Sequence, residues 1–294
     1  MVISILGIYP VVGQIPSEVL LYKNAPSMKK EGRQYNQDNK LTHIYGEVVS
    51  RLLVYKPDKA CGTGIIVCPG GGYSKMNVEN TRFIAERLTK LGITVFVLVY
   101  RLPVNDSTAL KPVAALQDVQ QAFRIVRNNA LQWKLSPNKL GLWGSSAGGH
   151  LAAMAATHYS QSFEVGEDTS GLRPDFLILA WPVVSFRPEL VHKGSMKNLL
   201  GDNPSEEEIA FYSPNESIDK NTPPTFLVHA ADDASVPVGN SICFFEALKK
   251  SNVPAELHIY ESGGHGFGIA PNVQDSWVNQ LERWLRKRKL IGNN

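Results

Sequence analysis

Gly144-Ser145-Ser146-Ala147-Gly148 follows the apolar run Leu140-Gly-Leu-Trp143 and precedes small residues that continue to about His158. The apolar run predicts a short buried strand, and the small residues predict a helix. A Gly-x-Ser-x-Gly pattern between a strand and a helix is typical of a tight turn that exposes the serine hydroxyl, because glycines leave room for it. We therefore predict Ser146 as a nucleophile and place Ser145 in the wrong register. The alternative is a glycine-rich helix start with a capping serine.

Strand and helix patterns alternate on both sides of this turn. Strands are predicted at 64–69, 93–100, 140–143, 175–181, 225–229 and 255–260, and helices at 77–91, 112–131, 147–158, 237–250 and 276–288. Near-continuous apolar strands that alternate with helices indicate an α/β fold whose mostly parallel sheet carries helices on both faces. Residues 42–56 are expected to add antiparallel strands at one edge.

The chain has 294 residues, a length that suits two domains or one large α/β domain. We predict one domain over 42–294, preceded by an N-terminal extension at 14–41. Residues 182–224 interrupt the alternation of predicted strands and helices. Ligands bind at the carboxyl ends of such strands, so we expect this segment to be a short lid-like insertion over the site. A plain surface excursion is the alternative.

Residues 1–13 are apolar and end in Val11-Val12-Gly13, but no Lys or Arg precedes them. They are expected to be a signal-peptide remnant or an apolar arm. The first interpretation favours a periplasmic or secreted location over a cytoplasmic one.

Composition argues against several classes of protein. The 30 Lys and Arg nearly balance the 27 Asp and Glu, and the one basic run, 286–289, suits the last turn of a helix. We therefore expect no nucleic-acid partner. Cys61, Cys68 and Cys243 lack metal-ligand spacing, so neither a metal site nor a disulfide scaffold is predicted. No run is long and apolar enough to predict a membrane span.

A serine nucleophile needs a base and an acid that orients the base. In sheets of this type the order along the chain is Ser, acid, His. His258 lies in the middle of a predicted strand, whereas His265 lies in a glycine-rich turn after that strand and can reach Ser146. Asp232 and Asp233 both follow the preceding strand. One of them should orient the imidazole and the other should be a solvated loop charge, and the residues alone leave the choice open.

An oxyanion needs donors that are fixed before the charge develops. Pro69-Gly70-Gly71-Gly72-Tyr73 follows the strand expected beside the nucleophile strand. We predict that the N–H groups of Gly71, Gly72 and Ala147 form an oxyanion hole, and that Tyr73 binds substrate. A phosphate loop is the rival interpretation, but no Gly-x-Gly-x-x-Gly or Gly-Lys-Ser/Thr pattern follows.

Several motifs in the same order carry a family resemblance over residues 45–288. The chain resembles the α/β-hydrolase superfamily, and within it the acetyl-xylan-esterase-like carbohydrate esterases, which are related to the hormone-sensitive-lipase and BD-FAE-like groups. The motifs are Cys68-Pro-Gly-Gly-Gly-Tyr73, Val99-Tyr-Arg-Leu-Pro103, Gly144-Ser-Ser-Ala-Gly-Gly-His150, His229-x-x-x-Asp233-x-x-Val-Pro237 and Gly263-Gly-His-Gly-Phe-Gly268.

The resemblance adds two expectations. The family spacing places the acid four residues after His229, which implies Asp233. It also implies that Arg101 and Asp118 form a structural pair beneath the site.

Two positions depart from the family pattern. Pro69 stands where the lipase relatives have the His of His-Gly-Gly, and Asn80 follows Glu79 where the esterase relatives usually have Gly. Both departures bear on substrate preference more than on the reaction.

The resemblance implies a serine esterase that removes short acyl groups, above all acetyl, from plant polysaccharides such as xylan. Ser146, His265 and Asp233 would form its catalytic triad, and no cofactor or metal is implied. The expected partner is a small-molecule or oligosaccharide ester, with no membrane. The alternatives are a general short-chain carboxylesterase, a prolyl-oligopeptidase-like peptidase, or a non-catalytic binding protein on the same fold.

Overall fold

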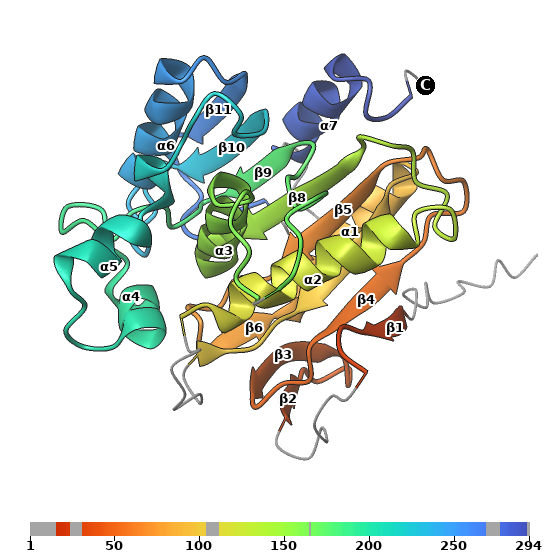
Figure 1. Ribbon diagram of the computed structural model, residues 1–294, viewed down its shortest axis with the longest axis horizontal. Helices are drawn as coiled ribbons and strands as arrows, with labels where there is room; N and C mark the ends of the chain where they lie inside the picture. Colours follow the sequence, from red (N-terminus) through yellow and green to blue (C-terminus); the bar gives the residue numbers. More distant parts are fainter. Residues whose placement is uncertain (1–15, 24–30, 104–111, 165, 269–276, 293–294) are drawn as a thin grey trace, which may run out of the picture.

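The computed structural model describes residues 16–23, 31–103, 112–164, 166–268 and 277–292. Residues 1–13, expected to be a signal-peptide remnant or an apolar arm, lie outside these ranges. An eight-stranded sheet forms the centre of the fold, in the order β1-β4-β7-β5-β8-β9-β10-β11 (Figure 1). Its strands are β1 (Ser17–Leu20), β4 (Arg51–Tyr55), β5 (Gly64–Cys68), β7 (Thr94–Val99), β8 (Leu140–Ser145), β9 (Leu177–Ala180), β10 (Thr225–Ala230) and β11 (Ala255–Tyr260).

The strands from β7 to β11 in this order pair in parallel, and β4 and β1 are antiparallel to their neighbours. Every residue of β5, β7 and β10 is buried, which explains why these strands are apolar without alternation. The predicted α/β-hydrolase fold with a mostly parallel sheet is therefore confirmed.

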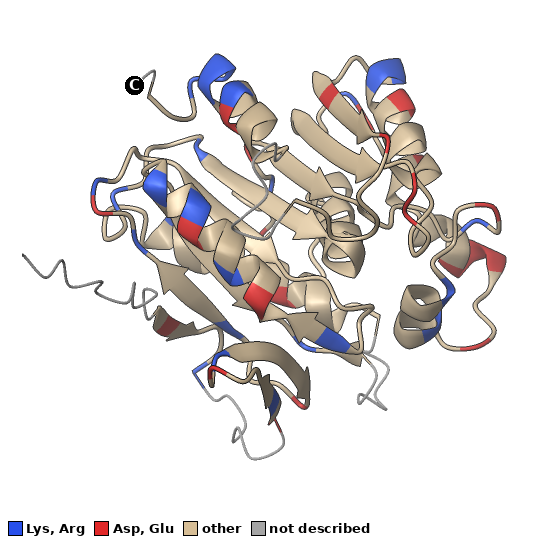
Figure 2. Cartoon of the chain, turned by 180° about the vertical axis from the view of Figure 1, so that it is seen from behind, with Lys and Arg blue, Asp and Glu red and all other residues tan. Residues whose placement is uncertain are grey.

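Helices cover both faces of this sheet. They are α1 (Val78–Lys90), α2 (Ala114–Asn128), α3 (Ser146–Thr157), α6 (Gly239–Lys250) and α7 (Val278–Lys287). Figure 1 shows α2 and α3 in front of the sheet, and Figure 2, from behind, shows α1 in front. The outer face of α1 carries acidic and basic residues in alternation, including the ion pair of Arg82 with Glu86 at 2.8 Å (Figure 2). No helix among the described residues is long and apolar enough to cross a membrane.

A second, three-stranded antiparallel sheet lies beside the first. It contains β2 (Glu31–Tyr35), β3 (Leu41–Gly46) and β6 (Lys75–Asn77), with β3 in the middle. Residues 42–56 were expected at one edge of the main sheet, and this is wrong for β3. Gly46 ends β3 with φ +80°, and the chain turns there before β4 joins the main sheet. The predicted extension, 14–41, supplies β1 to the main sheet and β2 to the small one.

The segment 182–224 lies on the side of the sheet at which β5 and β8 end (Figure 1). It contains α4 (Lys193–Leu200), α5 (Glu206–Phe211) and the 3₁₀ helix η3 (Pro214–Glu216). A capping box between Ser205 and Glu208 starts α5, because each side chain accepts from the other residue's backbone N–H. The segment thus has helical structure of its own next to the carboxyl ends of the strands.

Candidate active site

Ser146 lies at a sharp turn between β8 and α3. Its φ of +54° is in the left-handed region that non-glycine residues rarely adopt. A Cβ at Gly144 would lie 2.1 Å from the carbonyl oxygen of Gly148, and one at Gly148 would lie 2.2 Å from that of Cys68. Both positions therefore require glycine, and the turn presents Ser146 at the end of the sheet.

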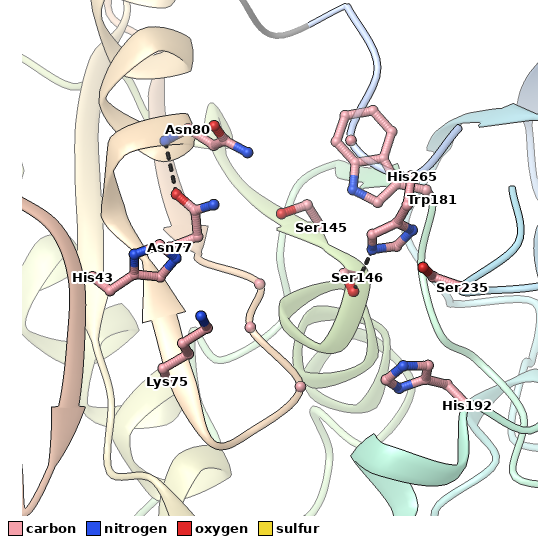
Figure 3. A pocket seen from close by; sticks show the side chains of 14 residues that line it. His43, Lys75, Asn77, Asn80, Ser145, Ser146, Trp181, His192, Ser235 and His265 are labelled. Atoms are coloured by element: carbon pink, nitrogen blue, oxygen red, sulfur yellow. Dashed lines mark hydrogen bonds between the residues drawn. The ribbon is translucent and has the colours of Figure 1, made fainter. Parts of the chain in front are cut away.

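The structure brings together the three residues predicted as a triad. His265 Nε2 lies 2.9 Å from Ser146 Oγ (Figure 3), and His265 Nδ1 lies 2.7 Å from Asp233 Oδ2. A carboxylate can only accept, so Nδ1 carries the proton and Nε2 is left to accept from the serine hydroxyl. This is the arrangement that general-base catalysis requires.

Asp233 is held in its ionised form. Its side chain is fully buried, and burial by itself would raise the pKa. The backbone N–H groups of Val236 and Ser235 donate to Oδ1 at 2.9 and 2.8 Å, and His265 donates to Oδ2. These hydrogen bonds outweigh burial, and the pKa of Asp233 lies below its ordinary value.

His229, four residues before Asp233, is a buried neighbour of that carboxylate. Its Nε2 lies 3.0 Å from the Val236 carbonyl oxygen and 3.2 Å from Asp233 Oδ2, and its Nδ1 lies 2.8 Å from Ser241 Oγ. Burial lowers the pKa of His229 and favours the neutral ring. The ring of His229 thus contacts the same oxygen of Asp233, Oδ2, that accepts from His265.

One of the two aspartates was expected to be a solvated loop charge. Asp232 is the exposed one, and it also makes hydrogen bonds that hold a turn. Its carboxylate accepts hydrogen bonds from the backbone N–H groups of Gly264 at 2.8 Å and Gly263 at 3.1 Å. These two bonds lower the pKa of Asp232. The exposed Asp232 thereby fixes the turn that carries His265.

The glycine loop after β5 requires glycine at Gly71. Gly71 and Gly72 have φ values of +140° and +64°, and a Cβ at Gly71 would lie 2.1 Å from the Lys75 carbonyl oxygen. The N–H groups of Gly71 and Gly72 donate to no residue in the described ranges. Ala147 is in the first turn of α3, where N–H groups have no partner within the helix. The three predicted oxyanion-hole donors are therefore available near Ser146.

The prediction that Tyr73 binds substrate is wrong. Tyr73 is 1% exposed, and its φ of +62° turns the side chain into the protein. Its hydroxyl lies 2.7 Å from His150 Nδ1, and His150 Nε2 donates to the Tyr212 carbonyl oxygen at 2.8 Å. Tyr73 thus anchors the glycine loop to α3 and to the insertion.

The insertion contacts the site at two further residues. Asn198 on α4 donates from Nδ2 to the Gly72 carbonyl oxygen at 2.7 Å. His192 precedes α4, and its Nδ1 accepts from the Ser195 backbone N–H at 3.1 Å, which caps the helix. Neither residue had a recognisable signal in the sequence.

The expected pair of Arg101 and Asp118 is present. Asp118 is fully buried and accepts from Arg101 Nε at 3.0 Å and from the Arg101 backbone N–H at 2.7 Å. Ser50 and Tyr22 donate to the same carboxylate at 2.8 and 2.9 Å. The pair and its two partners join α2 to residues that flank β1, β4 and β7, and the pair does not line the active-site cavity.

A cavity of about 380 Å³ opens above Ser146. It is lined by His43, Gly70, Gly71, Gly72, Lys75, Asn77, Asn80, Ser145, Ser146, Trp181, His192, Ser235, His265 and Gly266 (Figure 3). Within the described ranges no group of three or more His, Cys, Asp or Glu side chains could hold a metal ion. The cavity brings Ser146 and His265 together with the glycine loop.

Comparison with known proteins identifies the family. The sequence model of the BD-FAE family matches residues 52–248, more than half of the chain. The chain belongs to the BD-FAE family. The matched residues include the glycine loop, Ser146 and Asp233, and His265 follows them.

Among proteins similar to this BD-FAE chain is an acetylxylan esterase of Xylanibacter ruminicola, 36% identical over 81% of this chain and 48% of that protein. Endo-1,4-beta-xylanase B of Butyrivibrio fibrisolvens is 30% identical over 83% of this chain and 39% of that protein. The chain thus spans half the length or less of these two relatives. The acetyl ester-xyloside bifunctional hydrolase from Caldicellulosiruptor lactoaceticus has a similar structure, with a TM-score of 0.77 and 34% identity over 96% of this chain and 100% of that one.

Proposed function

We propose that this protein is a serine esterase that removes acetyl groups from acetylated xylan or xylo-oligosaccharides. The observation that carries the proposal is the hydrogen-bonded line from Asp233 through His265 to Ser146, next to a glycine loop with available N–H groups. A buried carboxylate, a histidine and a serine in this order form the constellation that activates a hydroxyl for attack on a carbonyl.

The reaction proceeds in two halves. In the first, His265 Nε2 takes the proton of Ser146 as Oγ attacks the ester carbonyl. The N–H groups of Gly71, Gly72 and Ala147 stabilise the oxyanion, and the buried Asp233 stabilises the imidazolium. The C–O bond to the sugar then breaks, and the sugar oxygen takes the proton from His265.

In the second half, water replaces the sugar alcohol. His265 takes a proton from the water molecule, and the resulting nucleophile attacks the acetyl-enzyme. The second oxyanion collapses, the bond to Ser146 Oγ breaks, and the serine regains a proton from His265. The products are acetate and free enzyme, so the cycle needs no metal or cofactor.

The acetylated sugar is proposed from the relatives, because two of them are named for acetyl ester hydrolysis and a third is named a xylanase. Polar residues also line the cavity, among them His43, Lys75 and Asn80, and polar side chains suit a sugar better than a long acyl chain. A polymeric plant substrate also supports a periplasmic or secreted location.

Acetate release from acetylated xylan and from 4-nitrophenyl acetate tests this function. The wild type should release acetate from both substrates, and a folded Ser146→Ala variant should release none above background. Butyryl and octanoyl esters and dipeptide substrates separate the alternatives. Faster turnover of the longer acyl esters would favour a general carboxylesterase, and amide cleavage would favour a peptidase.

A further inference from the structure

One wall of the active-site cavity is built by the small sheet. In its ladder His43 on β3 lies directly opposite Asn77 on β6, and Lys75 is two residues from Asn77 on the same strand. Opposite residues and alternate residues of a strand share one face of a sheet, so these three side chains point the same way. Ile44 and Met76 point the other way and are fully buried. The register of the ladder thus turns a polar face toward the cavity.

The start of α1 adds a fourth polar side chain to this wall. Asn77 Oδ1 accepts from the Asn80 backbone N–H at 3.0 Å and caps the helix (Figure 3). The cap fixes the first turn, and the Asn80 side chain lines the cavity from there.

The polar ends of this wall are available to a ligand. Within the described ranges, Lys75 Nζ, His43 Nε2 and the Asn80 amide have no hydrogen-bond or ion-pair partner. In Figure 3 these side chains lie across the cavity from His265. They project into the same cavity as Ser146.

The charge of Lys75 has no acidic partner among the residues that line the cavity. Lys75 is a cation there, and no Asp or Glu is among the lining residues. Glu79 does not line the cavity; its carboxylate accepts a hydrogen bond from Asn36 at 3.1 Å, and its charge acts on His43. The buried Asp233 accepts from His265. The cavity therefore favours a substrate that carries negative charge on the Lys75 side.

We propose that His43, Lys75 and Asn80 form an alcohol subsite that binds a carboxylate-bearing sugar, a uronic acid or its glycoside, next to the hydrolysed ester. The inference rests on the proposed function. If the substrate is an acetyl ester, its acyl part has no polar atom beyond the ester oxygens. The polar side chains of the wall, which lie outside the oxyanion hole, must then face the sugar, which is the alcohol part of the ester. Lys75 pairs with the sugar carboxylate, and Asn80 and His43 bind its hydroxyl groups.

The test compares two acetylated methyl glycosides that carry the acetyl group on the same ring hydroxyl. Methyl acetyl-β-glucuronoside has a carboxylate where methyl acetyl-β-glucoside has a hydroxymethyl group. At low ionic strength the wild type should prefer the glucuronoside by about fivefold in kcat/KM, as expected for one exposed ion pair. The preference should weaken as salt is added.

Substitutions assign the preference to one side chain. Lys75→Met keeps the apolar stem and removes the charge, so the ratio of the two kcat/KM values should fall to about one. Lys75→Arg should keep the preference. Lys90→Met is the matched control, because Lys90 is exposed at the far end of α1, and its ratio should equal that of the wild type.

A second measurement does not depend on which acetyl position is cleaved. The two unacetylated methyl glycosides are compared as inhibitors of 4-nitrophenyl acetate hydrolysis, and the glucuronoside should inhibit more strongly. Equal inhibition with equal kcat/KM values, or a Lys75→Met variant that keeps the wild-type ratio, would overturn the subsite and leave the esterase intact. A wild type that does not hydrolyse 4-nitrophenyl acetate would overturn the proposed function and the subsite with it.

Discussion

Asn198 of the insertion donates a hydrogen bond to the carbonyl oxygen of Gly72 at 2.7 Å, across 126 residues of sequence. Gly72 has a left-handed backbone and no side chain to restrain it. The bond therefore fixes the peptide that follows the proposed oxyanion donors. Through this contact the position of α4 is coupled to the geometry of the oxyanion hole.

Removing this bond should slow the chemical step more than it weakens substrate binding. In Asn198→Leu we expect kcat to fall about tenfold with KM changed less than twofold, because the donors must match the transition state rather than the substrate. Affinity for a boronic-acid transition-state analogue should fall in parallel with kcat. Steady-state kinetics and inhibitor titration measure both quantities.

Two further variants distinguish the loss of the hydrogen bond to Gly72 from a general disturbance of α4. Asn198→Gln keeps an amide donor and should recover part of the lost kcat. Lys197 is on the same helix and forms an exposed ion pair with Asp202, which follows the helix, so Lys197→Ala should leave kcat unchanged. Equal loss of kcat in the Leu and Gln variants would argue against a role for the hydrogen bond.

The two adjacent aspartates should differ strongly in their effect on the rate. Asp233→Asn removes the acceptor that fixes the His265 tautomer, and kcat should fall roughly 10⁴-fold. Asp232→Asn weakens two hydrogen bonds to the turn that carries His265, and kcat should fall only about tenfold. Activity with 4-nitrophenyl acetate measures the difference, and the reverse order would assign the acid to Asp232.

Tyr73 should matter for stability rather than for substrate preference. Tyr73→Phe removes the donor to the buried Nδ1 of His150, which would then lack a partner. We expect the free energy of unfolding to fall by about 1–3 kcal/mol. Urea unfolding measures this loss. The control Tyr45→Phe, at an exposed residue of β3, should stay within about 0.5 kcal/mol of the wild type.

Stability should decrease below neutral pH because of buried histidines. Burial lowers the pKa of His150 from 6.5 to about 4, so the unfolded chain binds the proton more readily than the folded one. Stability is then complete above pH 6.5 and is lost as the pH falls toward 4, by roughly 3 kcal/mol from this residue. Urea unfolding at several pH values and NMR titration of His150 measure this dependence, and a His150 signal that titrates near pH 6.5 in the folded protein would contradict it.

Local patterns were enough to predict the fold, Ser146 and His265, but they narrowed the acid only to Asp232 or Asp233, and the family spacing was needed to choose Asp233. The turn at Ser146 depends on its own glycines, and the buried parallel strands are apolar throughout, so both leave a signal within a few residues. His265 and Asp233 follow their strands directly. The order of a doubly covered parallel sheet then places them at the same edge.

Contacts between distant segments could not be predicted in this way. The pairing of β3 with β2 and β6 depends on the turn at Gly46, and nothing near Asn198 indicates its bond to Gly72. Tyr73 was assigned the wrong role because an aromatic residue after a glycine loop has no sequence signal for the direction of its side chain. That direction is set by the backbone φ and by the partner His150.

Covalent labelling tests most directly the claim that Ser146 is an activated nucleophile. The folded wild type is treated with a fluorophosphonate, and the modified peptide is identified by mass spectrometry. One adduct on Ser146 is expected, absent in Ser146→Ala and formed much more slowly in His265→Ala. Acetate release that persists in Ser146→Ala, or an adduct on another serine of the folded wild type, would contradict the account.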